Sequence, residues 1–251
     1  MPISAGQGAI LLAASAGAGV MNALAGGGTL LTFPALLLLG ESAIVANATS
    51  TVALLPGAAA SLAGYRREVA KHREWLRRLL LPSLLGGAAG SLLLLATPEQ
   101  TFARLAPWLV LFATALFTLQ WLRGAAGFAA LSAGAAAAFA AQLLISVYGG
   151  YFGAGIGILM LVVLGAMGLT DIHAMNGLKN FFGMCINGVA AGIFIASGRV
   201  DWPAALVMVV GAIAGGYAGA SFGRFLGQAR ARAAVVAIGL FASALLFFQQ
   251  L

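Results

Sequence analysis

The stretch ALAGGGTLLTFP, at residues 23–34, decides the fold class because three consecutive glycines interrupt a long apolar run. The run extends over residues 8–39 and contains no charged side chain. One helical span of a bilayer takes about 20 residues, so this run is too long for a simple crossing. Glycine is also costly in a helix interior. The stretch therefore predicts a broken helix, or a re-entrant pair of half-helices, inside a membrane segment.

A second apolar run, at residues 131–167, has the same form and carries the stretch GGYFGAGIG at residues 149–157. The alternating segments of about ten residues that mark a membrane β-barrel are absent from the sequence. We therefore expect an all-α polytopic membrane protein in which each long run forms a broken or re-entrant helix pair. Six other apolar segments have lengths near one helical span and lie at residues 43–64, 77–96, 104–122, 171–197, 203–223 and 231–248.

Composition supports this fold class. Of the 251 residues, 62% are hydrophobic and 8% are charged, whereas a soluble domain carries about 25% charged residues. Most of the outer surface must therefore contact the lipid bilayer. The net charge of +7 does not indicate binding to nucleic acid, because six of the thirteen Lys and Arg residues gather at residues 66–78. Such a cluster is typical of a cytoplasmic loop under the positive-inside rule.

An internal repeat is visible, because several landmarks recur at one constant offset of 129 in the numbering. It predicts two transmembrane units, at residues 1–123 and 124–251. Internal repeats in membrane proteins are typical of transporters whose site lies between the repeats. The matched landmarks are Gly26 and Gly28 with Gly155 and Gly157, Asn47 with Asn176, and Gly86, Gly87 and Gly90 with Gly215, Gly216 and Gly219.

The positions of the arginines bear on how the two units are oriented. If every segment crossed the membrane once, the basic loop at residues 65–76 would be inside and the loop at residues 224–230 outside, although that region holds Arg224, Arg230 and Arg232. Broken segments that enter and leave on one side place both loops in the cytoplasm, and the two repeats are then inverted. Eight simple crossings with parallel repeats and a weak charge bias remain the alternative.

The glycine breaks are the first candidates for a binding site. A half-helix that begins inside the membrane has N–H groups without helical partners, and these donors attract anions together with the positive end of the helix dipole. We expect the second half-helices to begin at Gly28 and Thr29 and at residues 155–157. Close packing of small residues between helices is the simpler explanation for some of the glycines.

Polar residues that follow the breaks extend the candidate site. Lys179 is the only basic residue well inside a predicted span, and its amine needs a partner, an aqueous cavity or an anion, unless it reaches outward to the membrane surface. Hydrogen bonding between helices is the structural alternative for the other polar residues. The full set of expected substrate-binding residues is Gly26, Gly27, Gly28, Thr29, Asn47, Thr49, Ser50, Thr51, Tyr148, Tyr151, Gly153, Gly155, Gly157, Asn176, Lys179 and Asn180.

Signals for enzymatic chemistry are scarce. The sequence has no HExxH, GxSxG or P-loop motif and no cluster of Cys and His ligands, so we expect no enzyme, no cofactor and no metal site. Glu41 and Asp171 each follow a broken segment. They suit the capping of the next helix better than a role in proton coupling, which stays open.

The stretches that carry these features resemble the TauE/SafE family of sulfite exporters. The first unit contributes NALAGGGTLLTFP at residues 22–34 and ANATST at residues 46–51. The second unit contributes GGYFGAGIG at residues 149–157 and NGLKN at residues 176–180, and the stretches GRVDW at residues 198–202 and GGYAG at residues 215–219 agree as well. The resemblance covers nearly the whole chain, and the combination of motifs is more specific than any single one.

The resemblance implies transport of small sulfur-containing anions, such as sulfite or sulfoacetate, across the inner membrane of bacteria, often as export. It leaves the substrate, the direction, the coupling ion and the oligomeric state open. Two other functions also remain: an anion channel, and a membrane subunit that transports nothing itself.

Overall fold

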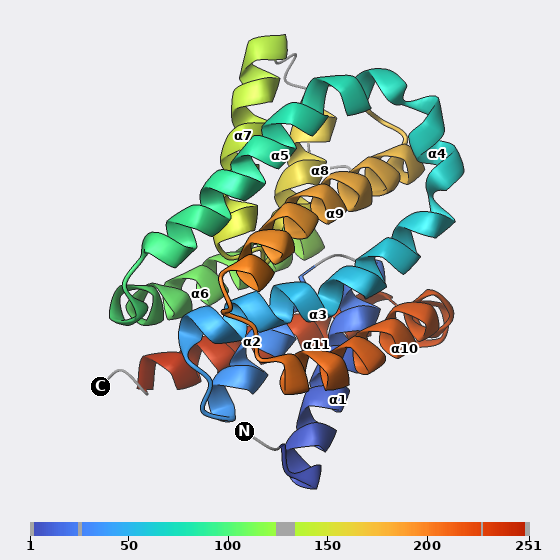
Figure 1. The fold of residues 1–251 in the computed structure, drawn as a ribbon. Helices are drawn as coiled ribbons and strands as arrows, with labels where there is room; N and C mark the ends of the chain where they lie inside the picture. Colours follow the sequence, from blue (N-terminus) through green and yellow to red (C-terminus); the bar gives the residue numbers. More distant parts are fainter. Residues whose placement is uncertain (1–2, 25–26, 124–133, 227, 249–251) are drawn as a thin grey trace.

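The structure, a computed structural model, describes residues 3–24, 27–123, 134–226 and 228–248, and within these ranges it contains eleven helices and no strand. The predicted all-α fold is therefore confirmed (Figure 1). The helices are α1 (Ala5–Leu24), α2 (Thr29–Leu38), α3 (Ala43–Gly64), α4 (Arg66–Lys71), α5 (Arg73–Ala96), α6 (Glu99–Arg123), α7 (Ala135–Tyr151), α8 (Ile156–Ala166), α9 (Ile172–Ala196), α10 (Trp202–Leu226) and α11 (Gln228–Phe248).

Several helices have the length and composition of membrane spans. Among the described residues, segments of α3, α5, α6 and α9 are long and apolar enough to cross a bilayer. Large apolar side chains such as Leu85, Leu144 and Leu206 are exposed on the outer surface. Exposure on this scale is typical of a surface that contacts lipid or a partner rather than water.

Both long apolar runs are broken at the predicted glycines. The first run divides into α1 and α2, and the second into α7 and α8. At the breaks Gly27, Gly153 and Gly155 have φ angles of +109°, +83° and +79°. Residues with a Cβ rarely adopt such angles, so glycine allows the chain to leave one helix and start the next within a few residues.

Helix boundaries differ from the sequence-based expectation in the basic region. The short helix α4 was not predicted, and α5 begins at Arg73 rather than at residue 77. Hydropathy cannot detect these turns because they are charged. Similarly, α6 begins at Glu99 rather than at residue 104. The carboxylate of Glu99 accepts a hydrogen bond from the backbone N–H of Ile44 at 3.1 Å, which joins the first turn of α6 to the first turn of α3.

Helix starts recur at the offset seen in the sequence. The first residues of α9 and α3 (172 − 43), of α10 and α5 (202 − 73) and of α11 and α6 (228 − 99) each differ by 129 in number. The division of the chain at residues 123 and 124 and the inverted orientation of the units stay predictions. Residues 124–133 lie outside the described ranges.

Helices from the two halves of the sequence are exchanged in the packing. The most extensive helix contacts are those of α1 with α10 and of α5 with α7, and both pairs join a helix of the first predicted unit to a helix of the second. Small residues permit the close approach: Gly86 of α5 lies against Leu143 and Ser146 of α7, and Gly215 of α10 lies against Ala16 of α1. This is the close packing expected of small residues in membrane helices.

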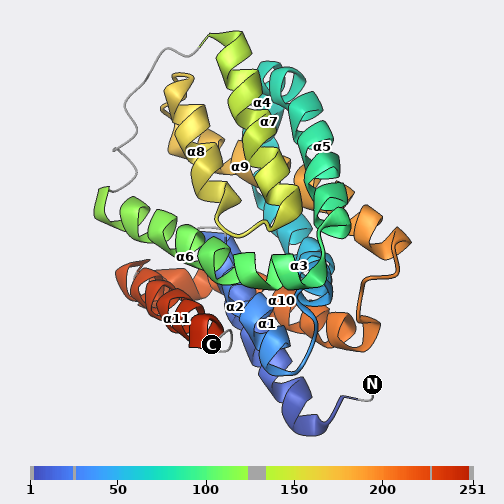
Figure 2. The ribbon, with the colours of Figure 1, turned by 90° about the vertical axis from the view of Figure 1, so that its left-hand side faces the viewer.

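The exchange yields two groups of helices. One group contains α1, α2, α3 and α10, and the other contains α5, α7, α8 and α9 (Figures 1 and 2). Contacts between α3 and α9 join the two groups, and α6 packs against α11 beside them. The helix breaks of both groups meet at this junction, which positions the candidate site.

Candidate functional site

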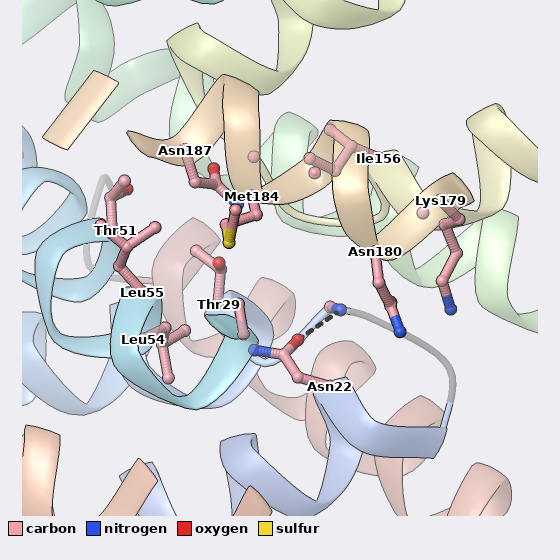
Figure 3. Close-up of a pocket in the computed structure, with 15 residues that line it drawn as sticks. Asn22, Thr29, Thr51, Leu54, Leu55, Ile156, Lys179, Asn180, Met184 and Asn187 are labelled. Carbon is pink, nitrogen blue, oxygen red and sulfur yellow. Dashed lines mark hydrogen bonds between the residues drawn. The ribbon is translucent and has the colours of Figure 1, made fainter. Parts of the chain in front are cut away.

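A cavity of about 80 Å³ lies between the two helix breaks and is walled by α3 and α9 (Figure 3). It lies at the junction of the two helix groups. The lining residues are Asn22, Gly27, Thr29, Thr51, Leu54, Leu55, Ala58, Gly153, Ile156, Gly157, Lys179, Asn180, Gly183, Met184 and Asn187.

The two helical walls of this cavity use equivalent positions. On each helix four lining residues follow the spacing i, i+3, i+4 and i+7, which places them on one face. Each of these residues on α9 is related to its counterpart on α3 by the repeat offset of 129. The four pairs are Thr51 with Asn180, Leu54 with Gly183, Leu55 with Met184, and Ala58 with Asn187.

The chemistry of the two walls is unequal. Helix α9 provides the side-chain amides of Asn180 and Asn187 and the ammonium group of Lys179, whereas α3 provides mostly apolar groups. A ligand in this cavity therefore meets hydrogen-bond donors and a positive charge on one side and a largely apolar surface on the other. This arrangement suits a small anion better than a cation.

Lys179 is the strongest electrostatic feature of the cavity. Lys179 is only 4% exposed. Its ammonium group therefore does not reach outward to the membrane surface, which was the alternative that the sequence left open. It forms no hydrogen bond or ion pair with the described part of the chain. A buried charge in a membrane protein is costly without a partner. The cavity therefore needs water or an anion to compensate it.

The N-termini of α2 and α8, the second half-helix of each break, differ in the partners of their backbone N–H groups. At the start of α2, the backbone N–H groups of Gly27 and Gly28 both donate to the side-chain oxygen of Asn22, at 3.0 and 2.8 Å. The N–H groups of Thr29 and Gly157 make no hydrogen bond to the described residues. Backbone N–H groups that lack a partner at a helix start can bind an anion by donating hydrogen bonds to it.

Comparison with known proteins identifies the family. The family model described as "Sulfite exporter TauE/SafE" matches residues 11–246. The chain belongs to the TauE/SafE family. A "Probable membrane transporter protein" of Haemophilus influenzae is 28% identical over 96% of this chain and 95% of its own length. No solved structure matches the chain significantly.

Two other relatives of this TauE/SafE protein carry similar names. The "Probable membrane transporter protein YfcA" of Escherichia coli K12 is 28% identical over 92% of the chain and 86% of its own length. The "Probable membrane transporter protein ORF9" of Sinorhizobium is 27% identical over 85% of the chain and 82% of its own length. With its apolar helices, the TauE/SafE protein is a multi-pass membrane transporter, and its family has a transport role rather than an enzymatic one.

The structure brings together part of the expected site of the TauE/SafE protein. Seven of the expected residues line the cavity: Gly27, Thr29, Thr51, Gly153, Gly157, Lys179 and Asn180. Gly26 lies outside the described residues. The remaining expected residues are absent from the cavity lining: Gly28, Asn47, Thr49, Ser50, Tyr148, Tyr151, Gly155 and Asn176.

Several of these remaining residues hold the breaks in place instead. The side-chain amide of Asn47 donates to the backbone oxygen of Tyr151 at 3.1 Å, next to the second break. The hydroxyl group of Tyr148 donates to the backbone oxygen of Ala154 at 2.7 Å, inside that break. Because polar groups in an apolar environment need partners, residues of this kind can stabilise the breaks without contacting a ligand.

The first break and the loop before α10 are held by similar hydrogen bonds. The hydroxyl groups of Ser50 and Thr32 are hydrogen-bonded, which joins α3 to α2. The hydroxyl oxygen of Thr49 accepts a hydrogen bond from the backbone N–H of Asp201 at 3.0 Å. These contacts are the structural alternative that the sequence left open for polar residues after the breaks.

Sequence reasoning missed eight lining residues, of which Asn22 and Asn187 are polar. Asn187 follows Asn180 by one i+7 step on the same helix face, and this spacing is a signal that the sequence contains. The repeat conceals it, because the counterpart of Asn187 is Ala58. The other missed residues are Leu54, Leu55, Ala58, Ile156, Gly183 and Met184.

The acidic residues lie away from this cavity. Asp171 caps α9, since its carboxylate accepts a hydrogen bond from the N–H of His173 at 2.9 Å. Glu41 lines a second cavity of about 160 Å³ together with Asp201. Burial, followed by the nearby Asp201, raises the pKa of Glu41 above its usual value of 4.5. Within the described ranges, no group of three or more His, Cys, Asp or Glu residues could hold a metal ion.

Proposed function

We propose that this protein transports a small sulfur-containing anion, sulfite or a short organosulfonate, across the bacterial inner membrane, in the direction of export. The observation that carries the proposal is the buried Lys179, which has no partner among the described residues and lies in a cavity between two helix breaks. A family whose model is described as a sulfite exporter supports the choice of substrate. Helical spans support the inner membrane, because proteins of the outer membrane are typically β-barrels.

The size of the cavity supports a small substrate. A pocket for a drug-sized ligand has a volume of about 300–1,000 Å³, whereas this cavity has about 80 Å³. Such a volume fits an anion with a few heavy atoms. In the substrate-bound state the oxygens of the anion would accept hydrogen bonds from the N–H groups of Thr29 and Gly157 and from the side chains of α9.

The packing of the helices supports transport by alternating access. The cavity lies where α3 of one helix group contacts α9 of the other. A relative movement of the two groups would open the cavity to one side of the membrane and then to the other. The moving groups would each combine helices from both sequence units, because α1 packs against α10 and α5 against α7.

Uptake of radiolabelled sulfite into proteoliposomes tests this function, and Lys179→Met tests its central residue. A hydrogen bond to a charged group contributes about 1.5–3 kcal/mol, so we expect sulfite affinity to fall roughly 10- to 150-fold. Lys71→Met is the matched control, because it makes the same change at an exposed position on α4. Equal affinity in both variants would remove Lys179 from the site.

The same proteoliposomes separate transport from the two other functions. A transporter shows saturable uptake and exchange of internal for external sulfite. An anion channel would instead show conductance without saturation or exchange. A membrane subunit without its own cargo would show neither, and that result, obtained with folded protein, would refute the proposal.

A further inference from the structure

The contact between Asn22 and the start of α2 is an unusual feature of the cavity. Asn22 lies in the last turn of α1, and its side-chain oxygen accepts hydrogen bonds from the N–H groups of both Gly27 and Gly28. In Figure 3 a dashed line marks a hydrogen bond to the side-chain oxygen of Asn22, and Lys179 and Asn180 extend from α9 toward the same side of the cavity. The oxygen thus lies where an oxyanion would bind these two donors.

The second break has no equivalent of this contact among the described residues. The counterpart of Asn22 in the second unit is Tyr151, and its hydroxyl group lies 3.4 Å from the hydroxyl oxygen of Thr97 rather than at the start of α8. The N–H of Gly157 is left without a partner in the described part of the chain. Within the described ranges, a side chain therefore occupies the backbone N–H groups at the first break but not those at the second.

Lys179 provides an independent indication that a ligand belongs here. It is 4% exposed, it lines the same cavity as Asn22, and it has no hydrogen bond or ion pair to the described residues. Asn22 presents a neutral oxygen, which satisfies the two backbone donors but leaves this positive charge uncompensated. An anion could satisfy the donors and the charge together.

We propose that Asn22 is an internal competitor of the transported anion: its side-chain oxygen occupies the N–H groups of Gly27 and Gly28 until an oxyanion displaces it. The inference rests on the proposed function and adds a basis for its selectivity. A neutral solute must break two hydrogen bonds to gain two similar ones. An anion gains charge-assisted hydrogen bonds, which are about twice as strong, and the attraction of Lys179.

Binding of a matched pair of compounds tests this inference. Methanesulfonate and dimethyl sulfone have nearly the same shape, and both present sulfonyl oxygens, but only methanesulfonate is charged. Isothermal titration of the whole chain in detergent measures both affinities. We expect the unmodified protein to bind methanesulfonate and to show no measurable binding of dimethyl sulfone.

Removing the competitor should strengthen binding. Asn22→Ala frees the two donors, so we expect methanesulfonate to bind about 5- to 150-fold more tightly and dimethyl sulfone to gain measurable affinity. Asn187→Ala is the matched control, because it removes the same side chain from the same cavity at a position that holds no backbone donor of α2. The control should strengthen the binding of neither compound, and it should weaken methanesulfonate binding if the amide of Asn187 contacts the anion.

A second variant decides the question even if Asn22→Ala does not fold. Asn22→Asp keeps the two hydrogen bonds and adds a tethered negative charge, so methanesulfonate affinity should fall at least about tenfold. Unchanged or weaker binding by a folded Asn22→Ala, or unchanged binding by Asn22→Asp, would overturn the inference while leaving the proposed function intact. Absence of binding of any sulfur anion by the unmodified protein would contradict both.

Discussion

Gly86 offers a quantitative test of the exchanged packing between α5 and α7. In Gly86→Ala the added methyl group would lie 2.5 Å from Cβ of Ser146, 2.7 Å from the backbone oxygen of Leu143 and 3.0 Å from the backbone nitrogen of Val147. Carbon atoms pack best at about 3.5–4.0 Å. The two helices must therefore separate by about 1 Å, and two of the three obstructing atoms belong to the backbone, which cannot rotate away.

The expected loss of stability is the balance of two destabilising contributions and one stabilising contribution. Overpacking a well-packed interface typically costs about 1–3 kcal/mol, and separation of α5 from α7 also weakens the hydrogen bond of 2.9 Å between Gln142 and Ser83, a net contribution of about 1 kcal/mol. Alanine returns up to about 1 kcal/mol through its higher helix propensity. We therefore expect Gly86→Ala to lower the free energy of unfolding by about 1–3 kcal/mol.

Thermal unfolding of the purified protein in detergent measures this effect. Gly188→Ala is the control, because among the described residues no atom apart from the adjoining backbone of α9 lies within 4 Å of the added methyl group. This variant should be as stable as the unmodified protein or slightly more stable. Gly215→Ala should behave like Gly86→Ala, since its methyl group would lie 2.7 Å from the carbonyl carbon of Ala16 on α1. If Gly86→Ala unfolds at the same temperature as Gly188→Ala, α5 and α7 do not pack as described.

Three other predictions concern polar contacts. The raised pKa of Glu41 means that the folded state keeps a proton that the unfolded state loses. The free energy of unfolding should therefore fall as pH rises above about 4.5 and through the raised pKa. Melting temperatures measured across this pH range should decline less for Glu41→Gln than for the unmodified protein. Ser83→Ala leaves the buried amide of Gln142 without its partner and should cost about 1–3 kcal/mol in chemical unfolding, a loss that Ser83→Thr should reduce. Glu99→Ala removes the acceptor of the Ile44 N–H and should destabilise the protein by about 0.5–2 kcal/mol in the same assay.

The sequence permits prediction of features that depend on local chemistry. The helix breaks follow from glycines that are costly inside helices, and their positive φ angles at Gly27, Gly153 and Gly155 are the conformations that glycine alone adopts easily. The cost of an unpaired charge in the membrane limited Lys179 to a partner, a cavity or the membrane surface, and the structure places it in the cavity.

Helix partners could not be predicted in the same way. Helices that contact lipid lack the polar face that would show which side is buried, and the small residues that permit contact do not specify a partner. Gly86 and Gly215 indicate close packing, but nothing in their sequence surroundings shows that the partners are α7 and α1.

Polar residues inside the membrane were the hardest to assign from the sequence. Asn47 and Asn180 each follow a helix break in the sequence, yet Asn47 binds the backbone at the second break and Asn180 lines the cavity. Both roles satisfy the rule that buried polar groups need partners. Only the three-dimensional position of the side chain separates a residue that stabilises the fold from one that can contact a ligand.

The pairing of α1 with α10 has a consequence for synthesis on the ribosome. Helix α1 ends at Leu24, whereas its main partner α10 begins only at Trp202. At about 5–20 residues per second, translation from the end of α1 to the start of α10 takes roughly 9–36 s. During that time the small-residue face of α1 needs a temporary neighbour, either lipid or an insertion factor. Assembly of this interface therefore waits until α10 has been synthesised, and a nascent chain that stops before Trp202 should leave α1 open to crosslinking in the membrane.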